Sequence, residues 1–154
     1  MRRKLATCLI LIVSMAAEAL EDDDLRIGMG EAEVVSVFTQ YRSCANVVLE
    51  EGSGRLAWEA QLRDRPARVE VSFLDGRVSS IVFRFTLEIE ESGRELLAAL
   101  VAEESLRQGS RPTLLGEERF RWNSPCRTAT VELAAVGSGR EVRITIEAVS
   151  CALP

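Results

Sequence analysis

The sequence predicts an α+β fold in which a helix followed by an antiparallel β-meander occurs twice, in the order α-β3/4-α-β3. Two observations support this prediction. Apolar and polar residues alternate with a period of two through most of the chain, as in strands with one buried face. Each of two such regions follows a stretch whose apolar residues recur at helical spacing. A chain of 154 residues is long enough for one domain or for two small halves that share a core or a sheet.

The first 19 residues have the pattern of a secretory signal peptide. Three basic residues precede an apolar run from Leu5 to Met15, and Ala17-Glu18-Ala19 matches an A-x-A cleavage site. The run is about half of the roughly 20 residues that a membrane-spanning helix needs. We therefore expect a Sec-exported, periplasmic or secreted protein that is cleaved after Ala19 and keeps no integral membrane segment.

The charged residues of the remaining chain exclude several classes of function. Removal of residues 1–19 takes away three of the 19 basic and one of the 24 acidic residues, which leaves a net charge of −7. Nucleic acid is a poor partner for such a chain. No Lys and no His remain, which excludes Ser-His-Asp and Cys-His catalysis, histidine metal ligation and lysine Schiff bases. We expect no cofactor, no metal and no catalytic residues, unless a carboxylate, a thiol or Tyr41 carries the chemistry.

The first half is expected over residues 25–90, after an acidic tail at residues 20–24. The tail lacks the Gly and the distal Glu of a calcium loop, which favours a disordered, solvated N-terminus. The stretch GMGEAEVVSVF, which begins at Gly28, resembles a helix N-terminus that could hold an anion. Glu31 and Glu33 would repel an anion there, and Glu33 can reach back to the cap. The stretch therefore predicts the entry to a packed helix, which spans about Glu31 to Thr39 and buries Val34, Val35 and Phe38.

Three strands are expected to follow this helix. Their inward-facing residues are Leu56, Trp58, Ala60 and Leu62, then Val69, Val71 and Phe73, then Ile81, Phe83 and Phe85. We expect the Asp75-Gly76 turn to be a three-residue loop with Gly76 in the left-handed conformation. That loop puts the second and third sets of residues on the same face.

The second half is expected over residues 91–154. Ser92 and Glu95 form a capping box, and a helix should run from about Gly93 to Gln108 and stop at Gly109. Alternating strands then resume. The segments 55–83 and 119–146 share an Arg-x-x-Trp strand, an alternating strand, a Gly turn and a second alternating strand, which favours an internal repeat.

Three cysteines follow the signal peptide. If the last hairpin turns through Ser138-Gly139, Cys126 lies opposite Cys151, and the same register places Val131 opposite Ile146. We therefore predict a disulfide between Cys126 and Cys151. Cys44 is left over as a buried thiol, an intermolecular link or a reactive nucleophile.

Other candidate sites have simpler explanations. The tryptophans Trp58 and Trp122 could line a partner contact with Tyr41, but their place on the alternating apolar face favours the core. The two GSGR strings join strands and are expected to be hairpin turns rather than phosphate loops. The acidic clusters are interpreted as solvated faces rather than as acid/base pairs; they are Glu88, Glu90 and Glu91, and Glu103 and Glu104.

The string LRIGMGEAEVVSVF resembles the start of the periplasmic modules typified by the BamE (SmpA/OmlA) lipoproteins, in which a helix enters an antiparallel sheet. The β-lactamase-inhibitor-protein fold is similar and occurs as a tandem of two such units. The resemblance implies a non-catalytic, partner-binding module. Gly30 stands where the BamE family has a capping Ser or Thr, and the chain has no lipobox.

The sequence thus favours an exported, non-catalytic protein-binding or structural module of the bacterial cell envelope, either an envelope-assembly accessory or an inhibitor. Its partner would be another envelope protein. The alternative is a thiol-dependent enzyme or redox protein that uses Cys44, which thiol alkylation kinetics would detect.

Overall fold

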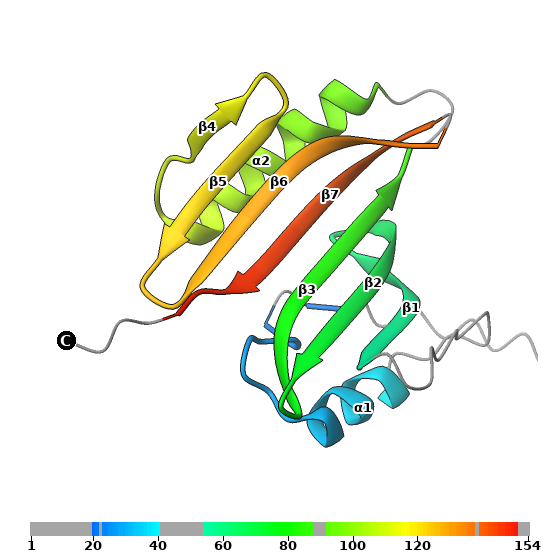
Figure 1. Cartoon of the computed structure of the whole chain (residues 1–154). Coiled ribbons are helices and arrows are strands. Elements are labelled where there is room, and N and C mark those ends of the chain that lie inside the picture. Colours follow the sequence, from blue (N-terminus) through cyan, green and yellow to red (C-terminus); the bar gives the residue numbers. More distant parts are fainter. Residues whose placement is uncertain (1–19, 22, 41–53, 88–91, 138, 151–154) are drawn as a thin grey trace, which may run out of the picture.

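A computed structural model describes residues 20–21, 23–40, 54–87, 92–137 and 139–150. Its elements are α1 (Glu31–Gln40), β1 (Arg55–Leu62), β2 (Arg65–Leu74), β3 (Arg77–Thr86), α2 (Gly93–Gln108), β4 (Thr113–Gly116), β5 (Arg119–Ser124), β6 (Arg127–Val136) and β7 (Gly139–Ala148). The strands form one antiparallel sheet in the order β1-β2-β3-β7-β6-β5-β4 (Figure 1). The third strand and the last strand therefore lie side by side at the middle of the sheet.

The predicted order α-β3/4-α-β3, with one helix-plus-meander unit repeated twice, is wrong. Antiparallel pairing of β3 with β7, from Ser80↔Glu147 to Thr86↔Glu141, joins all strands into a single sheet. The helices are also placed differently, since α2 packs on β6 and β7 whereas α1 begins beside the turn between β2 and β3. Alternation reports which face of a strand is buried, but not which strand lies next to it. The sequence pattern was therefore compatible with both arrangements.

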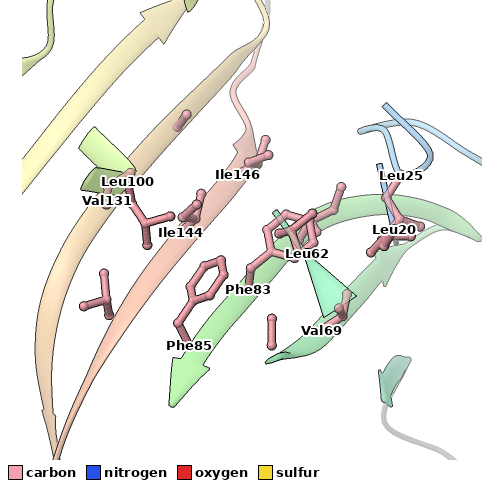
Figure 2. Close-up of a cluster of buried hydrophobic side chains, with 14 of the residues drawn as sticks. Leu20, Leu25, Leu62, Val69, Phe83, Phe85, Leu100, Val131, Ile144 and Ile146 are labelled. Atoms are coloured by element: carbon pink, nitrogen blue, oxygen red, sulfur yellow. The ribbon is translucent and has the colours of Figure 1, made fainter. Parts of the chain in front are cut away.

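One face of the sheet carries the hydrophobic core. Figure 2 shows Phe83 and Phe85 of β3 beside Ile144 and Ile146 of β7, where the two strands meet. All four side chains are at most 5 % exposed. Burying a side chain of this size contributes about 1.5–3 kcal/mol. Because both helices add residues to the same buried cluster, the described part of the chain has one continuous core.

Helix α2 has the predicted bounds. It begins at Gly93 and ends at Gln108, and Gly109 follows in the left-handed conformation with φ of 62°. The Gly109 N–H donates to the Leu106 carbonyl, which satisfies one of the last carbonyls of the helix. The predicted capping box is wrong, because the hydroxyl of Ser92 makes no cap hydrogen bond.

The N-terminus of α1 is capped by a side chain of its own first turn, and not left open for an anion, as the sequence predicted. The Gly30 N–H donates to the Glu33 carboxylate at 2.7 Å, as predicted from the position of Glu33. The preceding Gly28 has φ of 87° and donates its N–H to the Val78 carbonyl, which fixes the chain against β3. Of the predicted inward residues, Val34 is buried, but Val35 is 43 % exposed. The side chain of Phe38 lies outside the described residues.

The turn between β2 and β3 keeps the predicted buried faces of the two strands but has a different loop length. Leu74 pairs with Arg77, so the loop has two residues, Asp75 and Gly76, both with positive φ. A bulge at Ser79 then shifts the register, and Val71 faces Ile81 as predicted. The predicted three-residue loop is therefore wrong, although the predicted faces are correct.

The last hairpin has a register two residues away from the prediction. Its turn lies one residue earlier than predicted, with Val136 paired to Gly139, and Val131 lies opposite Ile144 instead of Ile146. The predicted faces survive, because a shift of two residues restores the alternation. The Cys126 carbonyl accepts a hydrogen bond from the Val149 N–H, so the register that placed Cys126 directly opposite Cys151 is wrong. Cys126 takes part in a disulfide, and Cys151 lies outside the described residues.

The residues after the predicted cleavage site are part of the fold. Leu20 and Leu25 are 2 % and 3 % exposed and belong to the core, as Figure 2 shows. The Leu20 N–H donates to the Gln61 carbonyl at 2.8 Å, beside β1. The expectation of a disordered, solvated tail is therefore wrong at Leu20, because this apolar side chain is buried in the core.

Candidate functional site

An apolar groove lies between α2 and the β4–β5 hairpin. Its volume is about 600 Å³. We refer to it below as the groove. Its lining residues are Arg94, Leu97, Ala98, Val101, Ala102, Glu117, Glu118 and Phe120. A volume of this size falls within the range of about 300–1,000 Å³ that is common for binding sites.

The groove exists because the sheet is wider than the helix that covers it. Helix α2 packs on β6 and β7, and the sheet continues through β5 to β4 on the same side (Figure 1). Phe120 of β5 lies on the core face but is only partly buried. Ala98 and Ala102 are one helical turn apart on α2, and their short side chains leave the wall of the groove open.

Beyond the groove, the edge strand β4 exposes apolar side chains. Leu114 lies opposite Phe120 in the register, and 61 % of its surface is exposed. Leu115 is 45 % exposed and interrupts the pairing of β4 with β5 as a bulge. Adjoining apolar residues on a surface mark contact sites more often than isolated ones do.

Charged side chains close one end of the groove. Glu118 accepts a hydrogen bond from Arg94 at 2.9 Å and one from Arg140. The hydrogen bond from Arg94 and the charge of Arg140 hold the pKa of Glu118 below its ordinary value. Glu117 lines the groove and makes no hydrogen bond with another described residue, although its charge helps to raise the pKa of Arg94. This end of the groove therefore offers one carboxylate to a partner.

The opposite face of the sheet, which we call the open face, carries a continuous row of ion pairs. Arg68, Arg84 and Arg143 lie directly opposite one another on β2, β3 and β7. Like charges in this arrangement are destabilising. Glu70 separates the first two and Glu141 the last two, at distances of 2.5–3.2 Å. The whole ion-pair ladder consists of Glu59, Arg68, Glu70, Arg84, Glu141, Arg143, Glu132 and Arg119.

We expect Glu70→Gln to lower the free energy of unfolding by about 1 kcal/mol, because an organised network is worth more than an isolated surface pair. Burial raises the pKa of Glu70, but hydrogen bonds and charge from Arg84 and Arg68 outweigh burial and lower it. The stabilisation is thus present above the ordinary value of 4.5 and is lost as the pH falls through the lower folded-state value. Urea denaturation at several pH values measures this change.

The control for this variant is Glu147→Gln. Glu147 lies on the same face, is exposed and has no ion pair among the described residues. If both variants lose the same stability at pH 7, the ladder contributes nothing specific.

Arg121, on the open face, stands outside the ladder. Arg121 of β5 makes no hydrogen bond or ion pair within the described residues, and its Nε is buried without an acceptor. A buried donor without a partner costs about 1–3 kcal/mol. Such an orphaned group in a folded chain calls for an explanation.

One buried carboxylate was not predicted from the sequence. Glu104, which we interpreted as part of a solvated face, is 0 % exposed. It accepts hydrogen bonds from Arg63 at 2.8 Å, from Arg107 at 2.9 Å and from Gln108 at 2.6 Å. The only local signal was its spacing, since residue 104 follows Leu100 and Leu97 on the inward face of α2. Arg63 comes from the turn between β1 and β2, so this cluster links that turn to α2.

The predicted contact and cysteine residues are not brought together in one site. Trp58 and Trp122 are each 2 % exposed, and the Trp122 Nε1 donates to the Ser110 carbonyl at 3.1 Å. Both are core residues, as the alternation favoured, and they offer no contact surface. Tyr41, Cys44 and Cys151 lie outside the described residues. The disulfide of Cys126 with Cys151 therefore stays a prediction.

The described residues lack two further kinds of feature, a metal-binding cluster and a membrane-spanning helix. No cluster of three acidic or cysteine residues there is arranged to hold a metal ion. No helix in the same ranges has the length and apolar character needed to cross a membrane. Comparison with protein-family models, curated proteins and solved structures found no match.

Proposed function

We propose that this chain is an exported, non-catalytic module of the bacterial cell envelope whose groove binds an amphipathic helix of another envelope protein. The observation that carries this proposal is the uncovered apolar face of β4 and β5 beside α2. The export pattern of residues 1–19 and the absence of Lys and His from the rest of the chain support it. An assembly accessory, as in the BamE resemblance, is the leading form of this role.

The geometry of the sheet favours a helix as the occupant. Strands are spaced about 4.8 Å apart, so two strand spacings measure about 10 Å. Packed helices lie about 8–10 Å apart. A second helix beside α2 would therefore lie over β5 and β4, against Phe120 and Leu114. Ala98 and Ala102 would permit its close approach.

The edge of the sheet disfavours the other common mode of recognition. Addition of a partner strand needs a straight edge with regularly spaced backbone groups. Strand β4 has only four residues, and the bulge at Leu115 breaks its spacing. Because the Glu117 carboxylate lies at this end of the groove, the partner helix is expected to carry a basic residue where it meets the β4–β5 turn.

Photo-crosslinking tests this proposal. A photoreactive phenylalanine analogue at position 98 should form an adduct with an apolar helical face of one envelope protein, mapped by mass spectrometry. The same analogue at Ala57, on the open face of β1, is the matched control and should not form that adduct.

A blocking variant makes the test specific. Ala102→Arg fills the groove at an exposed position, so we expect it to abolish the adduct and change stability by no more than about 0.5 kcal/mol. Ala57→Arg should leave the adduct intact. An adduct that persists with Ala102→Arg, or one that contains a lipid, contradicts the proposal.

A further inference from the structure

The two ends of the groove differ, and the difference follows the direction of α2. Arg94, in the first turn of α2, lines the groove at the same end as Glu117 and Glu118 of the β4–β5 turn. Farther along α2 the groove is lined by the apolar side chains of Val101 and Ala102. The charged groups of the groove therefore lie at the N-terminal end of α2.

The dipole of α2 gives this end of the groove a polarity. An α-helix carries a partial positive charge at its N-terminus and a partial negative charge at its C-terminus. The first-turn amides of α2 receive no cap from the Ser92 side chain, and the Arg94 side chain beside them is 74 % exposed. A neighbouring helix that ends near Gly93 would bring its partial negative charge to this positive end. The dipoles of the two helices therefore favour opposite directions.

Glu117 is compatible with the same direction if the partner helix supplies a cation. Its carboxylate makes no hydrogen bond with another described residue, whereas Glu118 is held by Arg94 and Arg140. Lys and Arg are stabilising in the last turn of a helix, because they complement its partial negative charge. A basic residue in the last turn of the partner would therefore meet Glu117 and offset the repulsion between that carboxylate and the final carbonyls of the helix.

We propose that the partner helix lies antiparallel to α2 and pairs a Lys or Arg of its last turn with Glu117. This inference rests on the proposed function, since it gives the direction and one charge of the helix that the groove binds. The groove-lining residues of α2 run from Arg94 to Ala102, which corresponds to about 12 Å of helix. The partner thus contacts the groove over about two turns, with apolar residues three or four positions apart facing Ala98.

Photo-crosslinking from two positions of α2 in the full chain measures this direction. Ser105 lies two turns beyond Ala98 on the same side of α2, and its hydroxyl donates to the carbonyl of the groove residue Val101 at 2.7 Å. The photoreactive phenylalanine analogue is placed at Ala98 or at Ser105, and mass spectrometry identifies the partner residue in each adduct. The partner residue that is linked to position 105 should precede the one linked to position 98 by about seven residues.

A charge-reversal variant tests the basic residue of the partner. Glu117→Arg should lower the yield of the position-98 adduct at least threefold, because two cations then face each other. Glu147→Arg makes the same change of charge on the open face, away from the groove, and should leave the yield unchanged. Equal melting temperatures of the two variants show that both are folded.

The failure of this inference is distinct from the failure of the proposed function. Partner residues linked in the opposite order, or an adduct from position 98 without one from position 105, would overturn the antiparallel arrangement and leave helix binding intact. Equal yields for Glu117→Arg and Glu147→Arg would overturn the pairing with Glu117. If position 98 forms no protein adduct at all, the proposed function itself is contradicted and the direction fails with it.

Discussion

Glu104→Ala is expected to lower the free energy of unfolding by about 3 kcal/mol, because breaking a buried ion pair leaves an uncompensated charge. The Glu104 side chain is fully buried, while its partners Arg63 and Arg107 are 13 % and 22 % exposed. This residual contact with water places the expected loss at the lower end of the usual range of about 3–5 kcal/mol. Urea denaturation at pH 7 measures the change.

Glu103→Ala is the matched control for this variant. Glu103 is the neighbouring residue, its side chain is 43 % exposed, and it lies 3.4 Å from the same Arg63. We expect a loss of less than about 1 kcal/mol, which is usual for an exposed pair. A double-mutant cycle between Arg63 and Glu104 should give a clear coupling energy. Equal losses for the two glutamate variants would contradict the buried-carboxylate interpretation.

The buried carboxylate also makes stability depend on pH. Burial raises the pKa of Glu104, but hydrogen bonds from Arg107, Gln108 and Arg63 outweigh burial and hold the pKa below 4.5. Its stabilisation is complete above that ordinary value and disappears as the pH falls through the lower folded-state value. The wild-type chain should therefore lose more stability on acidification than Glu104→Gln does.

Phe85→Ala is expected to cost about 3–5 kcal/mol, because it removes a fully buried aromatic ring and leaves a cavity. Phe85 pairs with Val142 where β3 meets β7, so this cavity weakens the junction at the middle of the sheet. The tryptophans report on opposite sides of that junction, Trp58 from β1 and Trp122 from β5. Denaturation of single-tryptophan variants should give one coincident transition, shifted equally for both probes.

Leu74→Ala is the control for the loss of a large apolar residue. Leu74 belongs to the same sheet but is 67 % exposed, so its truncation should cost less than about 0.5 kcal/mol. Separate transitions at Trp58 and Trp122 would mean that the two sides of the sheet unfold independently. That result would contradict the single core.

The features predicted correctly from the sequence are those with a local cause. Helix α2 ends at Gly109 because that residue adopts the left-handed conformation, and Glu33 reaches its own helix start three residues away. The buried face of each strand follows from alternation alone. These outcomes depend on residues within a turn or two of one another, so one sequence was sufficient to predict them.

The wrong predictions depend on distant partners. The pairing of β3 with β7 is a choice among possible neighbours, and neither strand specifies it alone. The shift that places Val131 opposite Ile144 keeps the same faces, so the apolar pattern could not detect it. Glu104 is buried because Arg63, far away in the sequence, supplies the compensating charge.

The candidate site was less predictable than the fold. The groove arises because the sheet is wider than α2. No single residue in the sequence predicts this difference in width. The aromatic residues that attract attention in a sequence, Trp58 and Trp122, are used in the core. The proposed contact surface instead includes Ala98, Ala102 and the partly buried Phe120, whose residue types carry no functional signal by themselves.

The two outer strands of the sheet have a consequence for self-association. A bulge interrupts the edge strand β4 at Leu115. At the opposite edge, the Leu20 N–H donates a hydrogen bond to the Gln61 carbonyl of β1. A second copy of the chain would find no continuous set of backbone groups at β4 and an obstructed carbonyl at β1. Edge-to-edge pairing of strands from two copies is thus opposed at both ends of the sheet.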